Sequence, residues 1–367
     1  MHTSEYDYLI IGGGPAGATA ARMLAQSGYR VALTEKNFNY NKPCGGGVKT
    51  IVFDEFDIPI TLERSRISTF NLFSPKRKRA CVDLTHYPIS IVDRQTFDQG
   101  LRQLAADAGA ILIHGKYKSL QIDPEKISVS VLQENELRIY NAKYVIAADG
   151  ANSTVRKTLL HKAPDSVMTH YRNISESPWN SCDFYFGNKV APHHYGWVFP
   201  HNGGVNIGVA IEKKSFIDEF SNSIINNHSK TKGHPIPLWN GDLFSYRNRV
   251  FFVGDAAGQV LPFTYEGIYY AIKSASILVN AIRSGNIEAY EQMWKAAFEK
   301  RFKFFKRMQK IFLCCNGMSE LMIRAFATPR FQKRALGYWM GTFKPLGFWK
   351  TFVKLSKIFS GYYQKTH

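Results

Sequence analysis

The sequence has few cysteines, and their spacing argues against two kinds of site. The five cysteines stand at positions 44, 81, 182, 314 and 315, and no two of them form a CxxC pair. An odd number without paired spacing predicts reduced thiols, and it argues against a disulfide framework and against a structural zinc site. We therefore expect neither a secreted protein nor a metal site.

Long apolar runs are also missing. No stretch reaches the roughly 18 consecutive apolar residues expected of a membrane-spanning helix. The apolar run near the start of the sequence is too short for a signal peptide and is accounted for by a strand. We therefore predict a cytoplasmic protein whose contact with a membrane is peripheral.

Acidic residues are scarce, with 29 Asp and Glu against 47 Lys and Arg. Residues 295–367 hold 16 of these basic residues but only Glu299 and Glu320 on the acidic side, and rings alternate with charges there, as in FEKRFKFFKRMQKIF. Such a helix fits an anionic bilayer surface; the alternative is a helical cap with a solvated basic face. Nothing resembles a base-reading motif, so we do not expect nucleic acid as a partner.

The strongest motif lies in residues 6–35, YDYLIIGGGPAGATAARMLAQSGYRVALTE. An apolar run, a glycine turn, a helix rich in small residues and a second apolar run predict a strand–helix–strand unit. Gly12, Gly14 and Gly17 satisfy GxGxxG, and amides at the following helix N-terminus would face a pyrophosphate. Glu35 ends the second strand, about 20 residues further on, where it could bind a ribose hydroxyl. A plain glycine-rich turn is the alternative to this dinucleotide site.

The rest of the 367 residues is long enough for a second domain. The pattern predicts a hairpin over 70–87, a helix capped by Thr96 and running to about 108, a strand over 110–114, antiparallel strands over 117–132 and 137–140, buried strands over 144–148 and 249–253, and a helix over 267–283. Between 165 and 248 helix signals are weak, and short aromatic strands are predicted over 183–186, 195–199 and 204–211.

Acidic residues follow two of the buried strands. Asp149 and Asp255 each stand beside a glycine at the end of a predicted strand. The glycine turn of residues 12–17 also follows a strand end. Ligands of doubly wound sheets bind beyond the carboxyl ends of the strands, so these carboxylates could accept ribose or ribityl hydroxyls. For Asp149 the alternative is a helix cap, a role that Asn152 or Ser153 could share.

Six stretches now carry a family resemblance. DYLIIGGGPAGATAA, the pair Asp93-Arg94, AADGANSTVR and VFFVGDAAGQVLPFTYEGI resemble flavoproteins of the p-hydroxybenzoate hydroxylase fold, and KPCGGGV and YGWVFP resemble the geranylgeranyl reductase family. The resemblance implies an α/β (α+β) fold. Its expected parts are a discontinuous FAD-binding Rossmann-like domain (1–65, 88–164 and 249–290), a β-rich substrate domain (66–87 and 165–248) and a basic, aromatic helical C-terminal region (291–367).

The resemblance also implies a non-covalent FAD and assigns residues to it. The expected cofactor-binding residues are Gly12, Gly14, Pro15, Ala16, Gly17, Glu35, Lys36, Cys44, Gly45, Arg94, Asp149, Gly254, Asp255, Pro262, Glu266, Gly267 and Ile268. Arg94 is expected near the pyrophosphate, and the catalytic loop of Cys44, Gly45 and Gly46 beside the isoalloxazine ring. The alternative for Cys44 is an ordinary thiol in a loop.

The same resemblance predicts a substrate wall of Tyr195, Trp197, Phe199 and Pro200, although an aromatic stripe at this spacing also suits plain core. The sequence departs from the family pattern at three places. His201 replaces a lysine, Gly208-Val209-Ala210 replaces Gly-x-Gly, and Tyr265 stands where relatives commonly have glycine, so that its ring would crowd or gate the flavin.

These features predict an FAD-dependent reductase that saturates C=C bonds of a polyprenyl, geranylgeranyl-type chain of a lipid or quinone at the cytoplasmic membrane face. Reduced flavin would deliver the hydride, and NAD(P)H or a ferredoxin would supply the electrons. One alternative is a flavin-dependent monooxygenase or halogenase of the same fold. Another is a flavin-bearing membrane or partner-binding protein without turnover.

Overall fold

A computed structural model describes residues 5–175, 177, 179–201, 203–226, 229–241, 244–247 and 249–343. Its contacts divide the chain into two compact units. Unit 1 comprises Met1–Arg64, Val92–Ser166 and Pro235–Ala297, and unit 2 comprises Ser65–Ile91, Val167–His234 and Phe298–His367. The domain boundaries expected from the sequence stay a prediction.

Unit 1 is built on a parallel sheet. Its main elements are β1 (Glu5–Ile11), α1 (Pro15–Ala25), β2 (Val31–Glu35), β3 (Gly47–Lys49), α2 (Ile51–Glu55), α3 (Arg94–Asp107), β8 (Ile111–His114), β9 (Lys116–Ile122), β10 (Ile127–Gln133), β11 (Glu136–Ala147), α4 (Thr154–Leu160), β17 (Ser245–Tyr246), β18 (Val250–Phe252), η2 (Gly254–Ala257), α6 (Ile268–Arg283) and α7 (Ala289–Trp294). The strand order is β17-β18-β11-β1-β2-β8, and β11, β1, β2 and β8 run parallel.

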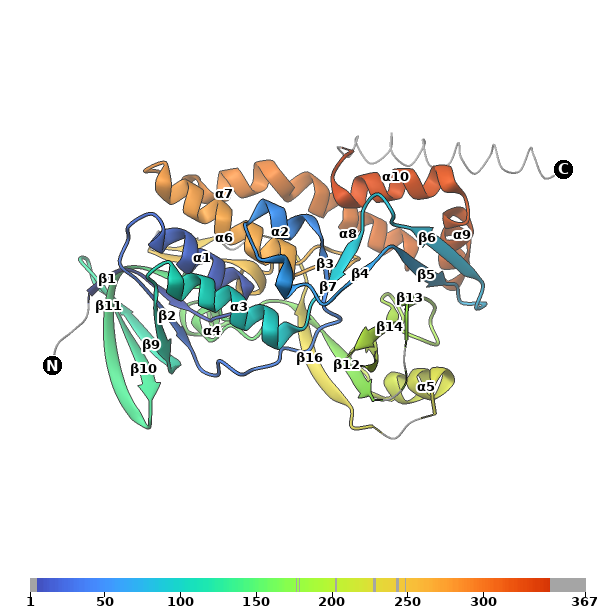
Figure 1. Ribbon diagram of the computed structural model, residues 1–367, viewed down its shortest axis with the longest axis horizontal. Helices are drawn as coiled ribbons and strands as arrows, with labels where there is room; N and C mark the ends of the chain where they lie inside the picture. The colour runs from blue at the N-terminus through green and yellow to red at the C-terminus, as the bar shows by residue number, and fades with distance from the viewer. Residues whose placement is uncertain are drawn as a thin grey trace. The chain divides into compact units, whose positions relative to one another are not determined.

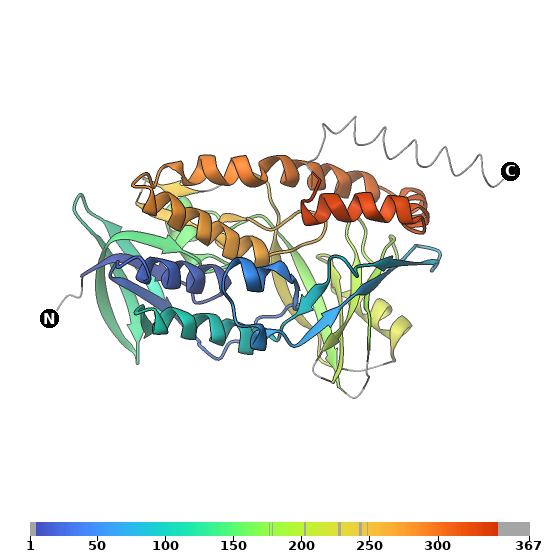
Figure 2. The ribbon, with the colours of Figure 1, turned by 45° about the horizontal axis from the view of Figure 1, so that its top comes forward.

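The sheet of unit 1 is covered by helices, of which α1 contacts both α3 and α6, as Figures 1 and 2 show. Strands β9 and β10 pair antiparallel with each other and with β11. The central strand β1 is buried along most of its length, because both faces of the sheet are covered there. Its sequence is therefore a nearly continuous apolar run rather than an alternation of apolar and polar residues, as expected for a buried parallel strand. This confirms the predicted α/β class.

Unit 2 is built on a seven-stranded sheet of order β16-β12-β15-β14-β13-β5-β6. Its elements are β4 (Ser65–Ile67), β5 (Thr69–Phe73), β6 (Arg79–Asp83), β7 (Ile89–Ile91), β12 (Ser166–Ile174), β13 (Cys182–Tyr185), β14 (Gly196–His201), β15 (Gly204–Ala210), α5 (Ser215–Ile224), β16 (Lys232–Pro237), α8 (Lys300–Phe312), α9 (Asn316–Phe326) and α10 (Pro329–Met340). Ile217 and Phe220 of α5 pack with Val198 and Ile207 in one core. No helix in the described ranges combines the length and apolarity needed to cross a bilayer.

Three expectations about elements were wrong in detail. Helix α3 begins at Arg94, and Asp93 rather than Thr96 caps it, because the Asp93 carboxylate accepts the Thr96 N–H at 3.0 Å. Residues 136–147 form one strand where two were expected, since buried Asn141 interrupts the apolar pattern while its side chain is satisfied by Ser128. Helix α5 was missed, because its Ser and Asn residues weaken the helical signal.

Candidate functional site

The glycine turn after β1 is packed so tightly that two of its positions cannot hold a side chain. A Cβ at Gly12 would lie 2.4 Å from the carbonyl oxygen of Ala148, and one at Gly17 would lie 1.9 Å from that of Gly12. Gly12 also has a φ of +107°. At Gly14, by contrast, a Cβ would meet nothing within 4 Å. Open space therefore lies in front of the α1 N-terminus, where the helix amides attract an anion.

Helix α1 leaves its first amides available to such an anion. Within the part of the chain that the structure describes, no side chain caps this helix, Pro15 occupies its first position, and its first turn contains no acidic residue. Uncapped amides at a helix N-terminus retain their hydrogen-bonding capacity. The arrangement of Gly14, Pro15 and Ala16 thus matches a diphosphate site.

Glu35 lies at the end of β2, next to the glycine turn. Its Oε2 accepts the Gly13 N–H at 2.8 Å, and its Oε1 accepts the Asn37 N–H at 3.0 Å. Buried Arg102 donates to the Gly13 carbonyl at 2.9 Å and to that of Phe38 at 2.5 Å, while burial lowers its pKa. The expected residue Lys36 is exposed beside them.

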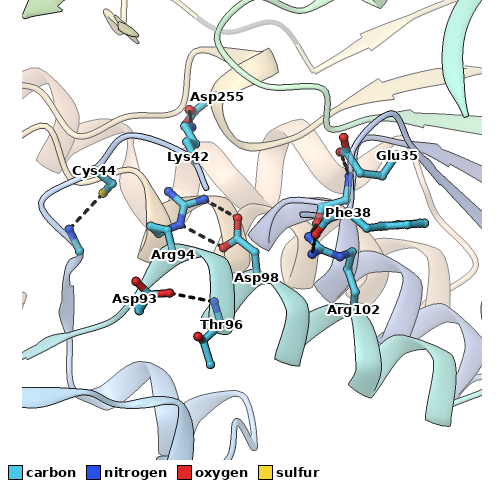
Figure 3. Close-up of polar contacts among 12 residues, drawn as sticks. Glu35, Phe38, Lys42, Cys44, Asp93, Arg94, Thr96, Asp98, Arg102 and Asp255 are labelled. Carbon is cyan, nitrogen blue, oxygen red and sulfur yellow. Dashed lines mark hydrogen bonds and ion pairs between the residues drawn. The ribbon is translucent and has the colours of Figure 1, made fainter. Parts of the chain in front are cut away.

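Arg102 is a residue that sequence reasoning missed. Arg94, Asp98 and Arg102 follow one another at intervals of four along α3, which puts them on one face of the helix. That spacing of alternating charges was the available signal. Figure 3 shows Arg94 and Asp98 lying between the Glu35 end of the site and the end formed by Cys44, Lys42 and Asp255.

Arg94 is buried and forms a bidentate pair with Asp98, with distances of 3.0 Å from Nε to Oδ1 and 2.7 Å from NH2 to Oδ2. Burial disfavours its charge, but Asp98 and the neighbouring sulfur of Cys44 overcome this and raise the pKa of Arg94. Its guanidinium is therefore a fixed positive charge beside the Cys44 loop. Its expected contact with a pyrophosphate stays a prediction.

The loop of Cys44, Gly45 and Gly46 lies against the chain that enters α3. Gly46 has a φ of +73°, and a Cβ there would lie 2.4 Å from the carbonyl oxygen of Val92. The Gly46 carbonyl accepts the Val92 N–H at 2.9 Å, and the Cys44 sulfur accepts the Gly46 N–H at 3.3 Å. Only glycine permits this approach, so the exposed thiol of Cys44 is held in a defined place.

Asp255 lies where η2 meets the N-terminus of α6. Its Oδ2 is 2.6 Å from Lys42 Nζ, and its Oδ1 would lie 3.3 Å from a Cβ at Gly267. Gly254, with a φ of +60°, donates its N–H to Gln259 and Ser274. The expected residues Pro262, Glu266 and Gly267 lie in the turn that leads into α6, and Ile268 is the first residue of that helix.

Sequence reasoning also missed Lys42 and Lys49. Lys42 pairs with Asp255, and Lys49 lies 3.8 Å from Glu266. Both lysines lie within seven residues of the Cys44 loop, so charge near that loop was the only sequence signal. Together they bring the Cys44 loop, Asp255 and the turn before α6 into one neighbourhood of unit 1.

Asp149 and Ser153 together cap α4: Ser153 is the N-cap residue, and its hydroxyl accepts the Arg156 N–H at 3.0 Å. The Asp149 carboxylate accepts the Thr154 N–H at 2.6 Å and the Val155 N–H at 3.0 Å, and the Ser153 hydroxyl donates to it at 2.6 Å. Burial raises the pKa of this carboxyl group despite these donors. These hydrogen bonds support the alternative that Asp149 caps a helix. The expected role of Asp149 at the cofactor remains a prediction.

The aromatic motif of unit 2 divides into a buried and a half-buried part. Tyr195 is buried and packs on Phe184 with ring centroids 5.6 Å apart, as plain core would. Phe199 packs on the same ring at 5.1 Å but, like Trp197 and Pro200, keeps part of its surface accessible. The Trp197 indole donates from Nε1 to Asn206 at 2.6 Å and lies over Gly208. The accessible part of the predicted wall therefore consists of Trp197, Phe199 and Pro200.

The site of unit 1 fits FAD. The open space at Gly14 and the uncapped amides of α1 suit the diphosphate, Glu35 suits a ribose hydroxyl, and Asp255 at the α6 N-terminus suits the ribityl side. The glycine loop at Cys44 leaves backbone accessible to a flat ring system.

Comparisons with known proteins agree with this geometry. Residues 5–178 match the family model of an FAD binding domain, and residues 165–237 match that of the geranylgeranyl reductase catalytic domain. The chain is 32% identical to a geranylgeranyl diphosphate reductase of Rhodobacter capsulatus, over 83% of this chain and 84% of that protein. It is 29% identical to a digeranylgeranylglycerophospholipid reductase of Methanocaldococcus jannaschii, over 88% and 90% of the two chains.

Solved structures show the same fold. A geranylgeranyl bacteriochlorophyll reductase-like protein of Thermoplasma acidophilum superposes with a TM-score of 0.81 at 23% identity, over 91% of this chain and 96% of that one. A flavin-dependent brominase superposes with a TM-score of 0.77 at 14% identity, over 99% of this chain and 100% of that one. At these identities the two structures establish the fold of the chain and nothing finer.

Proposed function

Because the chain belongs to the geranylgeranyl reductase family of FAD-dependent enzymes, we propose that it saturates C=C bonds in the polyprenyl chain of a lipid or quinone. The observation that carries the proposal is the match of residues 165–237 to the family's catalytic domain, because that range contains the motif from Tyr195 to Pro200. The names of the relatives, which specify prenyl diphosphates and prenyl glycerophospholipids, support a prenyl substrate.

The residues of unit 1 would hold the cofactor. The amides at Gly14 and Ala16 would bind its diphosphate, Glu35 its adenosine ribose, and Asp255 its ribityl side. FAD, when bound and reduced, supplies a hydride. Cys44, held by the Gly46 amide and beside the Arg94 charge, would lie next to the reacting ring and would hold or relay the proton that the second alkene carbon requires.

The substrate offers the protein little to polarise. An isolated alkene has no carbonyl group, so positioning and exclusion of water must lower the barrier. The half-buried rings of Trp197 and Phe199 provide apolar surface for a prenyl chain, and the hydrogen bond from Trp197 to Asn206 fixes one of them. Apolar rings with a fixed orientation are suited to holding a flexible chain in one conformation.

Two further parts of the proposal concern partners. The exposed basic residues of α8 would contact an anionic membrane surface, from which the lipid substrate would be taken. The electrons would come from NAD(P)H or a ferredoxin; a basic surface suits docking of an acidic ferredoxin, and a nicotinamide would bind transiently.

The test is anaerobic photoreduction of the purified holoprotein, followed by addition of prenyl lipids with different head groups. We expect flavin reoxidation and a mass gain of about 2 Da per double bond, since each reduction adds one hydride and one proton. Reoxidation without a saturated product would overturn the proposal. Absence of any reoxidation by the whole lipid series would favour the binding protein without turnover.

A second candidate is a flavin-dependent monooxygenase or halogenase, which the fold shared with the brominase favours. It predicts substrate-dependent oxygen consumption and an oxygenated or halogenated product. The reductase predicts the same product with and without oxygen. Comparing products under argon and under air therefore separates the two.

A further inference from the structure

We infer that Lys49 is a positioning residue, which joins the strand after the Cys44 loop to the turn before α6 and holds that turn in a strained conformation. The inference rests on the proposed function, because it gives that turn its place at the flavin. Lys49 ends β3, directly after the Cys44 loop, and Glu266 stands in the turn before α6. The family resemblance implies that this loop and this turn both lie at the flavin.

The turn before α6 contains two bulky residues in a conformation that normally requires glycine. Phe263 has a φ of +74° and Tyr265 a φ of +55°. Aromatic L-residues in the left-handed region are outliers, because Cβ approaches the following carbonyl oxygen. Such strain persists only when surrounding contacts determine the conformation, and it concentrates at functional sites. The turn therefore needs partners that hold it.

Backbone and side-chain contacts supply part of that support. The Leu261 N–H donates to the Glu266 carbonyl at 3.0 Å, and the Tyr265 N–H donates to the Leu261 carbonyl at 3.1 Å. The Thr264 hydroxyl donates to Glu266 Oε2 at 3.3 Å. These bonds close the turn on itself, and all of them involve Glu266 or its immediate neighbours.

Lys49 ties this turn to the rest of unit 1. Its side chain is only 4% exposed, and Nζ lies 3.8 Å from Glu266 Oε2 and 3.4 Å from the Tyr270 hydroxyl. The same ammonium group lies over the rings of Tyr269 and Tyr270, at 5.0 and 5.2 Å from their centroids. Carboxylate, hydroxyl and ring faces thus surround one buried cation.

A buried lysine is a costly way to stabilise a fold. Removing an ammonium ion from water is expensive, and an ion pair at 3.8 Å returns only part of that cost, so an apolar side chain of similar length would often serve the core equally well. A role in positioning accounts for the Lys49 charge. The ammonium group holds the Glu266 carboxylate, and with it the strained turn, against the segment that follows Cys44.

The test combines Lys49→Met, Glu266→Gln and their double variant in the full-length protein, with and without FAD. Hydrogen exchange followed by mass spectrometry reports the turn through the amides of Leu261, Thr264 and Tyr265. We expect exchange about tenfold faster or more in each single variant, equivalent to about 1.4 kcal/mol, with no added effect in the double variant. FAD dissociation should accelerate in parallel, while exchange in β1 stays unchanged.

Two further variants keep the test decisive. Lys273→Met, which removes the ion pair between Lys273 of α6 and Glu55 of α2, is the matched control and should leave the turn unchanged. Tyr265→Gly relieves the left-handed strain, so Lys49→Met should cost the turn less protection in that background.

Two results would overturn the inference. The first is an unchanged turn in folded Lys49→Met, and the second is a loss of protection spread evenly over unit 1, which would make Lys49 an ordinary core residue. Because the exchange is also measured without FAD and needs no prenyl lipid, its failure is distinguishable from failure of the proposed function.

Discussion

Gly14 and Gly17 stand three residues apart, but a methyl group added at each would meet different surroundings. At Gly17 the new Cβ would lie 1.9 Å from a backbone oxygen, so Gly17→Ala must displace the turn and should cost about 1–3 kcal/mol of stability. At Gly14 the methyl meets no protein atom, so Gly14→Ala should change stability by about 1 kcal/mol or less.

For FAD binding, the substitution at Gly14 should be the damaging one, because the space that its methyl group fills is the space expected to hold the diphosphate. The Gly14→Ala methyl occupies the open space in front of α1, so we expect a folded protein whose FAD affinity falls about tenfold or more. Thermal unfolding of the FAD-free variants measures the stability change, and flavin fluorescence titration measures affinity. Undiminished FAD binding by Gly14→Ala would contradict the placement of the diphosphate at α1.

The cysteines allow a test of where the flavin ring lies. Burial raises the pKa of Cys182 to about 12, so at pH 8 only about one molecule in ten thousand carries its thiolate, and that fraction rises only as the pH approaches 12. Cys44 and Cys81 are exposed. Iodoacetamide at pH 8 should therefore label Cys44 and Cys81 readily and leave Cys182 unmodified.

Bound FAD should slow labelling of Cys44 about tenfold or more and leave Cys81 unaffected, because only Cys44 stands in the loop predicted to lie on the ring. Peptide mass spectrometry with and without FAD measures both rates in one sample, with Cys81 as internal control. Equal labelling of Cys44 in the two states would remove it from the flavin site.

At the scale of elements, the sequence predicted the helices and strands that are determined by residues close to one another along the chain. The β1–α1–β2 unit was predicted closely, because the constraints at Pro15 and Gly17 and the apolar runs arise within a few residues along the chain. Strands β13, β14 and β15 were predicted within two residues for the same reason. Arg102 and Lys49 were missed, because each acts on a partner far along the chain, at Gly13 and at Glu266 respectively.

The pairing of β14 with β15 explains one departure from the family pattern. Trp197 lies directly opposite Gly208, and a Cβ at Gly208 would lie 2.1 Å from the indole. Only the first glycine of the expected Gly-x-Gly is therefore needed to seat this ring, and Ala210, buried in the sheet, replaces the second. The sequence alone could not show which of the two glycines faced an aromatic residue.

Gly208→Ala should consequently rotate the Trp197 indole and break its 2.6 Å hydrogen bond to Asn206. We expect altered tryptophan fluorescence and prenyl-lipid affinity reduced about tenfold, while FAD content stays the same because Gly208 lies in unit 2. Equilibrium titration with a prenyl lipid gives the affinity. Unchanged affinity despite a changed fluorescence spectrum would show that Trp197 is core rather than substrate wall.

At the scale of the whole molecule, part of the excess positive charge lies on one helix, α8. Lys300, Lys303, Arg307 and Lys310 of α8 are spaced by three, four and three residues and therefore share one helix face. The rings of the same helix are buried on the other side, namely Phe302, Phe304, Phe305 and Phe312. Rings and charges that alternate in the sequence are thus separated in space, and the exposed side chains of α8 are all charged. Of the second basic stretch, FKPLGFWKTFVKLSKIF, all but Phe343 lies outside the described residues.

Because of this separation, the proposed attachment of α8 to a membrane would be electrostatic. A basic residue near an anionic bilayer contributes about 1 kcal/mol, so changing Lys303, Arg307 and Lys310 to Glu should weaken binding to phosphatidylserine vesicles about a hundredfold or more. Raising the salt from about 0.1 M to 1 M should weaken native binding too, because the screening length falls from about 10 Å to 3 Å. Loss of the exposed Lys303–Glu299 pair should cost little stability.

The matched control is a triple change of Lys116, Lys118 and Lys126 to Glu, which alters the net charge equally on exposed positions of unit 1. Vesicle co-sedimentation of both variants separates a local surface from the overall charge. If the two variants lose binding equally, net charge rather than α8 draws the protein to lipid. If the α8 variant binds as the native protein does, its basic face is a solvated one, and the prenyl substrate must reach the enzyme without it.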